Sequence, residues 1–232
     1  METSKTGKTL RLVAIILVGL NAAMNLLGGI GTTCAAFFTK EYPPMWSIYK
    51  YQWLYQAFVV IGILVGLAGI WTVIKLVRGG KTALRDTLIV LVIGAVVNTI
   101  HVIASLALRG AAAPANVVLG LNVIALLFML YLGTPGMRKQ VRFDQESGPS
   151  EQTAASGMAA IIAGVVVLST PMWAGPTHMF QGQNWVDVLL APLYLVGGLF
   201  VVFGVSRLVR LAMELRQSQA GQPIQAESTS AM

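Results

Sequence analysis

Charge is scarce in this chain of 232 residues, where Asp, Glu, Lys and Arg together make up 11% of the sequence. A typical soluble domain carries about 25% of these residues. Hydrophobic residues make up 56%, and they gather in six apolar runs close to the length of about 20 residues that a membrane-spanning helix needs. This composition leaves no room for a soluble domain and predicts an integral membrane protein.

Cysteine and histidine are also rare, and their rarity excludes several kinds of site. Cys34 is the single cysteine, so the chain can form neither an intrachain disulfide nor a cysteine-based zinc site. The two histidines, His101 and His178, fall in an expected helix and an expected loop, which excludes a bis-histidine haem. We therefore expect no metal site and no cofactor.

Residues that carry catalysis or ion transport are missing from the apolar runs. No run has Asp, Glu, Lys or Arg near its middle, whereas proton and sodium pathways usually depend on buried carboxylates. The sequence also has no phosphate-binding loop, nucleophile elbow or HExxH motif. These absences make an enzyme the less favoured interpretation.

What the chain has instead is a regular arrangement of basic residues. Thirteen of its sixteen Lys and Arg residues form four clusters, which alternate with gaps that hold only Lys40, Lys50 and Arg109. The clusters are Lys5, Lys8 and Arg11; Lys75, Arg78, Lys81 and Arg85; Arg138, Lys139 and Arg142; and Arg207, Arg210 and Arg216. Because cytoplasmic loops are enriched in Lys and Arg, the alternation predicts that both termini are cytoplasmic. The net charge of +7 then faces anionic lipid, and no nucleic acid is expected as a partner.

The fold class that follows is an all-α, polytopic membrane protein with six transmembrane helices. We expect these helices over residues 10–38, 54–77, 87–108, 115–132, 157–173 and 186–213. A four-helix transmembrane unit over 1–142 would be joined by a polar cytoplasmic linker, 143–156, to a transmembrane helical hairpin over 157–216. The polar residues 217–232 are expected to form a disordered cytoplasmic tail. The N-terminal run resembles a signal peptide, but its apolar character continues too far for one, so an uncleaved helix is the preferred interpretation.

Neutral polar residues inside the helices supply the candidate site. They are Asn21 and Asn25 in the first helix, Asn98, His101 and Ser105 in the third, and Asn122 in the fourth. At a rise of 1.5 Å per residue, most of them lie about 20 to 24 Å from the basic clusters. Neutral amides in lipid must find partners or water, so they either bond helices together or line an intramembrane polar pocket with His101 as its one titratable member.

Small residues and aromatic residues form two further patterns. Gly62, Gly66 and Gly69 make a row on which another helix can pack closely, and the partner would be a helix of this chain or of a second copy. Aromatic residues are dense between residues 42 and 55, as in the belt at a membrane surface. An alternative is that this loop and the loop over 174–184 form a lid over the polar residues.

The sequence favours a non-enzymatic subunit, assembly factor or scaffold of a membrane complex in a bacterial cytoplasmic membrane. Its partners would be the lipid bilayer and other membrane subunits or further copies of the chain. The alternative is a carrier or binding protein for a small neutral or amphipathic molecule, which would bind among the helices expected over 10–38, 87–108 and 115–132. A membrane oxidoreductase or lipid-modifying enzyme would have to rely on His101 alone.

Overall fold

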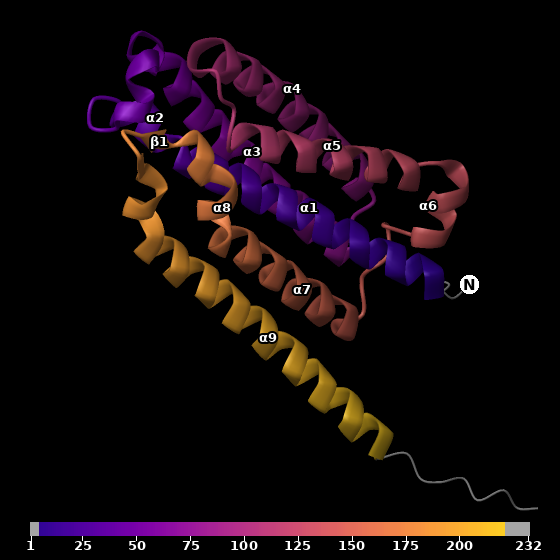
Figure 1. Ribbon diagram of the computed structural model, residues 1–232. Coiled ribbons are helices and arrows are strands. Elements are labelled where there is room, and N and C mark those ends of the chain that lie inside the picture. Colours follow the sequence, from indigo (N-terminus) through magenta and orange to yellow (C-terminus); the bar gives the residue numbers. More distant parts are fainter. Residues whose placement is uncertain (1–4, 221–232) are drawn as a thin grey trace, which may run out of the picture.

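Six long helices run side by side through most of the molecule (Figure 1). The structure is a computed structural model that describes residues 5–220. Its helices are α1 (Lys5–Gly31), α2 (Thr33–Phe37), α3 (Gln52–Arg78), α4 (Ala83–Arg109), α5 (Ala115–Leu132), α6 (Pro135–Val141), α7 (Pro149–Leu168), α8 (Thr170–Ala174) and α9 (Leu190–Ala220). Short 3₁₀ helices are η1 (Pro43–Tyr51), η2 (Gly175–Thr177) and η3 (Trp185–Leu189). The only strands in the described residues, β1 (Met179–Phe180) and β2 (Gln183–Asn184), form one antiparallel pair.

The helical class and the number of long apolar helices agree with the sequence. Six segments are long and apolar enough to cross a membrane: Lys5–Phe37, Pro43–Arg78, Ala83–Arg109, Ala115–Leu132, Pro149–Leu168 and Trp185–Gln217. The first is interrupted for one residue at Thr32, where α1 gives way to α2. The expected tail over 217–232 starts too early, because α9 continues to Ala220; residues 221–232 lie outside the described part of the chain.

The expected linker over 143–156 is too long, because α7 already begins at Pro149. The helix α6 was not expected at all. Both helices start at a proline, Pro135 and Pro149, which follows a residue with extended backbone. Proline fits the first turn of a helix because its missing N–H would have no helical partner there. The polar residues after Pro149 therefore form the first turns of a long helix rather than a loop.

The four basic clusters meet at one end of the bundle, which we call the basic end. Arg11 of α1 is 5% exposed, and its guanidinium donates to the main-chain oxygens of Leu76 (2.7 Å) and Gln145. It thereby satisfies a carbonyl in the last turn of α3, which has no partner within the helix. Lys75 pairs with Asp86 across the α3–α4 turn, so this end is held by charge as well as packing.

The row formed by Gly62, Gly66 and Gly69 lies against α1. A Cβ atom on Gly66 would fall 2.5 Å from Cγ of Leu26, and one on Gly69 would fall 2.7 Å from Cβ of Ala22. These separations are shorter than van der Waals contact, so only glycine permits this approach of α3 to α1. The face that small residues provide is thus occupied within the chain.

The last two long helices, α7 and α9, cross closely through a second set of glycines. A Cβ on Gly204 would lie 2.5 Å from the main-chain oxygen of Gly157, and one on Gly164 would lie 2.7 Å from that of Gly197. α7 also packs against α1, whereas α9 lies on the outside of the bundle (Figure 1). The α7–α9 pair is therefore attached to the other helices mainly through α7.

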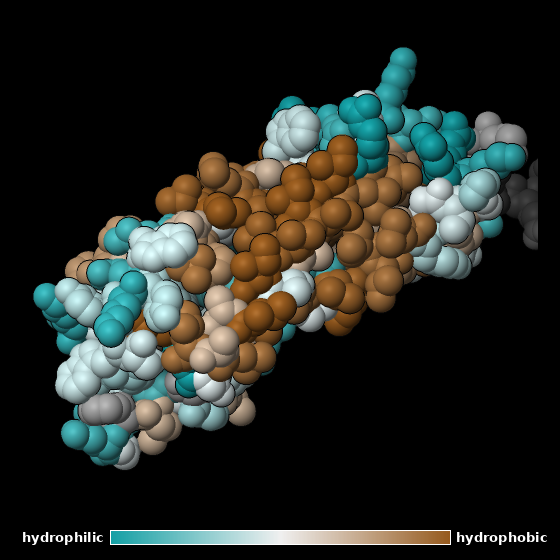
Figure 2. Space-filling model, turned by 90° about the horizontal axis from the view of Figure 1, so that it is seen from above, coloured by the Kyte–Doolittle hydropathy of each residue, from teal (hydrophilic) through white to brown (hydrophobic). Residues whose placement is uncertain are grey.

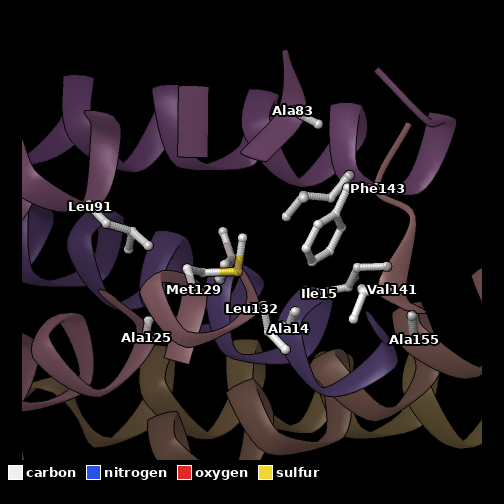
Figure 3. Packing of buried hydrophobic residues seen from close by; sticks show 12 residues of the cluster. Ala14, Ile15, Ala83, Leu91, Ala125, Met129, Leu132, Val141, Phe143 and Ala155 are labelled. Atoms are coloured by element: carbon white, nitrogen blue, oxygen red, sulfur yellow. The ribbon is translucent and has the colours of Figure 1, made fainter. Parts of the chain in front are cut away.

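Apolar side chains cover the middle of the molecule and polar ones gather at its two ends, as Figure 2 shows for one face. Inside, apolar residues from α1, α3, α4, α5, α6 and α7 form a cluster toward the basic end. Figure 3 shows Ile15, Met129, Leu132 and Phe143 among its members. A second cluster joins α2, η1 and α3 at the opposite end, which we call the aromatic end. The polar candidate residues lie between these two clusters.

Candidate functional site

Three of the predicted polar residues form a hydrogen-bonded chain that joins two helices. The side-chain amide of Asn25 donates to the main-chain oxygen of Asn21 (2.9 Å), and the amide of Asn98 donates to Oδ1 of Asn25 (3.0 Å). All three side chains are buried. Bonds of this kind between membrane helices contribute about 0.6 to 2 kcal/mol each. The contact of Asn98 with Asn25 therefore links α4 to α1 by a hydrogen bond.

Asn122 of α5 lies apart from this chain. It is fully buried, and neither its Nδ2 nor its Oδ1 has a hydrogen-bond partner among the described residues. Its amide faces Gly94 of α4 so closely that a Cβ on Gly94 would lie 2.5 Å from Nδ2. An amide buried in this way costs about 1 to 3 kcal/mol, so Asn122 weakens the bundle where Asn98 strengthens it.

His101 does not join the asparagine chain either. Its ring stacks on Phe58 of α3 at 4.2 Å between centroids and 19° between planes. It also meets Tyr55 edge to face at 5.8 Å. Tyr55 in turn lies 3.2 Å from the hydroxyl of Ser105. The residues predicted from α4 therefore divide into Asn98, which bonds to α1, and His101 and Ser105, which pack against aromatic rings of α3.

Two adjoining cavities lie beside these residues. One is at the level of Asn25 and Asn98, and the other is nearer the aromatic end. The first, which we call the layer cavity, encloses about 340 Å³ including its open mouth, and Asn25, Asn98 and His101 contribute to its walls. The second, the Arg109 cavity, encloses about 290 Å³ on the same measure. They share Thr32, His101, Pro114 and Ala115. The free space inside each admits molecules of about the size of water.

The Arg109 cavity contains residues that the sequence did not mark as a site. Its walls include Cys34 from α2, Tyr55 from α3, Arg109 from the end of α4 and His178 from the loop before α9. Tyr55 is 1% exposed although the sequence placed it in a surface belt. Its spacing of three residues from Phe58 and seven from Gly62 was a signal that it faces the interior.

The loop between α8 and α9 covers this cavity at the aromatic end. Tyr42, at the start of η1, contacts Trp185 edge to face at 5.8 Å. His178 is held by a 2.8 Å contact of its Nδ1 with the main-chain oxygen of Ala174. Burial lowers the pKa of His178 from its usual value, and the positive charge of Arg109 lowers it further, while the Ala174 contact acts in the opposite direction.

Comparisons with known proteins give no further guide to this arrangement. No protein-family model, curated protein or solved structure matches the chain. A group of three or more His, Cys, Asp or Glu residues that could hold a metal ion does not occur among the described residues. The site is thus defined by its own geometry, a bonded asparagine layer beside two small cavities.

Proposed function

We propose that the chain is a non-enzymatic subunit of a membrane complex and that α9 contacts a helix of the partner subunit. The observation that carries this proposal is the exposure of α9. Only 11% of the most apolar part of its span is buried, against 22% to 50% in the other five spans. The helix that lies on the outside of the bundle therefore offers the largest uncovered apolar surface.

The exposed residues of α9 follow the spacing of a helix–helix contact. Leu195, Leu199, Val202, Ser206, Val209 and Met213 are all exposed and recur at intervals of four and three residues. Residues at these intervals share one face of a helix, and that face is the one by which helices pack along each other. A second helix in the membrane fits this face along most of its length.

A matched pair of variants tests the proposal. Val202→Trp places a bulky ring on the exposed face of α9, where Val202 is 68% exposed, and Val96→Trp does the same on α4, where Val96 is 55% exposed. After affinity purification in mild detergent, we expect a stoichiometric partner with the wild type and with Val96→Trp, and at least a tenfold loss with Val202→Trp. The measurement is quantitative mass spectrometry with native gel electrophoresis.

Equal recovery from both variants would contradict the proposal, and so would a strictly monomeric wild-type particle. The nature of the partner follows from a cross-link. In a Cys34→Ala background, Leu199→Cys forms an intermolecular disulfide when a second copy of this chain provides the facing helix. A partner of different sequence leaves Leu199→Cys unlinked to itself while the loss with Val202→Trp remains.

The arrangement of the chain in the membrane belongs to the same proposal. We place the basic end and both termini in the cytoplasm, in the cytoplasmic membrane of a bacterium. The convergence of the four basic clusters on one end supports this orientation. The aromatic end, with Trp46, Trp53 and Tyr49 exposed, then lies at the outer surface, where amphipathic rings are favoured.

A second candidate function rests on the layer cavity. A carrier or binding protein for a small neutral or amphipathic molecule would use Asn25, Asn98 and His101 to bind it, and the adjoining Arg109 cavity would lead to that site. Because the free space in each cavity admits only molecules of about the size of water, the helices would have to move apart to admit a larger ligand. Replacement of Asn98 and His101 by Leu should then abolish uptake into vesicles, and unchanged uptake would exclude this function.

A further inference from the structure

Arg109 stands out among the charged residues because it lies in a cavity without an acidic partner. Its Nε is buried and has no hydrogen-bond partner among the described residues. Arg109 takes part in none of the ion pairs in the described part of the chain. These pairs join Lys8 to Glu151, and Asp86 to Lys75 and Arg85. Arg109 as a whole is only partly buried, but an Nε–H removed from water needs an acceptor, because a buried donor without one is costly.

The described residues that line the Arg109 cavity carry no negative charge. Among its lining residues are Cys34, Tyr55, Ser105 and His178, and none is Asp or Glu. Burial is the main cause of the lowered pKa of His178, and the positive charge of Arg109 adds to it. The polar groups present are those that accompany Arg in anion sites, with hydroxyls and ring nitrogens around a guanidinium.

The position of Arg109 at the last residue of α4 does not supply the missing acceptor. The free carbonyls in the last turn of a helix often accept from a basic side chain nearby, as Arg11 does for α3. At the end of α4, however, the main-chain N–H of Gly110 donates to the oxygen of Leu106 (2.9 Å), and no hydrogen bond from the Arg109 side chain to a described carbonyl accompanies it. Arg109 therefore differs from the structural arginine at the other end of the bundle.

The size of the cavity limits which ligand can bind to the guanidinium of Arg109. Its free interior matches a group of about the size of a water molecule, which excludes a nucleotide or a sugar phosphate. A halide ion or the carboxylate group of a short organic acid has suitable size and charge. We propose that the Arg109 cavity is a binding site for a small singly charged anion, held by the guanidinium of Arg109 with the hydroxyls of Tyr55 and Ser105 beside it.

This site is independent of the proposed contact through α9, because it lies among α2, α3, α4 and the loop before α9. Its occupation would neutralise the one Lys or Arg among the described residues of the cavity wall and bring together residues from four segments of the chain. The anion would therefore act as a structural ligand of the aromatic end. Bound to the folded state alone, it would also raise the stability of the protein.

Direct binding measurements test the proposal. The purified full-length protein in mild detergent is titrated with radiolabelled chloride and, separately, with radiolabelled formate, at an ionic strength held constant with a bulky sulfonate buffer. We expect saturable binding of one ion per chain for at least one of the two, and competition between them identifies whether halide or carboxylate is preferred. Absence of saturable binding of both would overturn the proposal.

Two variants locate the site. Arg109→Gln should weaken binding at least tenfold, whereas Lys50→Gln, which removes an exposed cation at the same end of the molecule, should leave it within twofold. Equal binding by Arg109→Gln and the wild type would contradict the assignment. Near-ultraviolet circular dichroism establishes that each variant keeps its tertiary structure.

A measurement on the wild type tests whether the anion binds in the Arg109 cavity even where Arg109→Gln does not fold. Cys34 is the only cysteine and lines the same cavity, so a bound anion should slow its reaction with N-ethylmaleimide. We expect the labelling rate to fall at saturating chloride or formate and to stay constant in the sulfonate buffer. Binding without any protection of Cys34 would place the anion elsewhere and overturn the proposal.

Discussion

At the scale of single residues, two buried asparagines are expected to have opposite effects on the stability of the bundle. Asn98 donates to Asn25 and joins two helices, while Asn122 has no hydrogen-bond partner among the described residues. Removing one partner of a buried hydrogen bond leaves the other unsatisfied, whereas removing a group without a partner relieves a cost. The residue type alone does not determine the contribution.

Leucine substitutions at these two positions should therefore differ in sign. Asn98→Leu leaves Oδ1 of Asn25 without its donor and should lower the free energy of unfolding by about 1 kcal/mol. Leucine has nearly the same shape as asparagine, so Asn122→Leu should leave the free energy of unfolding unchanged or raise it. Thermal unfolding in detergent, followed by tryptophan fluorescence, measures both. A loss with Asn122→Leu as large as that with Asn98→Leu would show that Asn122 has a partner.

At the scale of helices, glycine decides which faces meet. The approach of α3 to α1 requires Gly66 and Gly69, and the approach of α9 to α7 requires Gly157 and Gly204. Without a hydrophobic driving force between helices in lipid, close packing of this kind is a main source of association. Long apolar helices would otherwise have no preferred neighbours.

An alanine at Gly66 should separate α1 from α3. Its Cβ would lie 2.5 Å from Cγ and 2.9 Å from the main-chain nitrogen of Leu26, so the helices must shift, at an expected cost of about 1 to 3 kcal/mol. Gly120 of α5 is the matched control, because a Cβ there would have no neighbour within 4 Å. Gly120→Ala should raise stability slightly through its helix propensity. Equal melting temperatures for both variants in detergent would refute this account of the contact.

Sequence patterns predicted the long helices well and the short elements poorly, for a physical reason. An apolar run long enough to span a bilayer is a strong local signal, and the expected range 115–132 coincides with α5. The residues after Pro149 are polar, and for that reason the expected linker extended to residue 156, although α7 begins at Pro149. The polar residues inside the helices could be singled out from the sequence because helical spacing and depth are local properties of each helix.

The Arg109 cavity could not be found in this way. Cys34, Tyr55, Arg109 and His178 come from four segments, and nothing in the local sequence of one segment points to the others. Arg109 was one of three basic residues outside the clusters, and its isolation was the only sign of a different role. Which asparagine pairs with which also depends on the rotation of each helix, and periodicity leaves that rotation undetermined.

At the scale of the whole molecule, the distribution of charge along the bundle gives a test of orientation. In a Cys34→Ala background, we introduce single cysteines by Lys81→Cys in the α3–α4 turn and by Gln183→Cys in the loop before α9. With the basic end in the cytoplasm, a membrane-impermeant thiol reagent applied to intact cells should label Gln183→Cys only. Permeabilised cells, in which both positions must react, provide the control. Labelling of Lys81→Cys alone would reverse the orientation.

The hydrogen bonds of Arg11 have a consequence for the order in which the protein is made. Arg11 joins Leu76 and Gln145, which are synthesised long after it, and Gly79 lies so close to Gln145 that a Cβ would fall 2.2 Å from its carbonyl carbon. The basic end therefore cannot be completed while only the first helices have been synthesised. Until residue 145 has been synthesised, the guanidinium of Arg11 can reach Leu76 but lacks its acceptor at Gln145, so the basic end reaches its final packing only after α5 and α6 have been made.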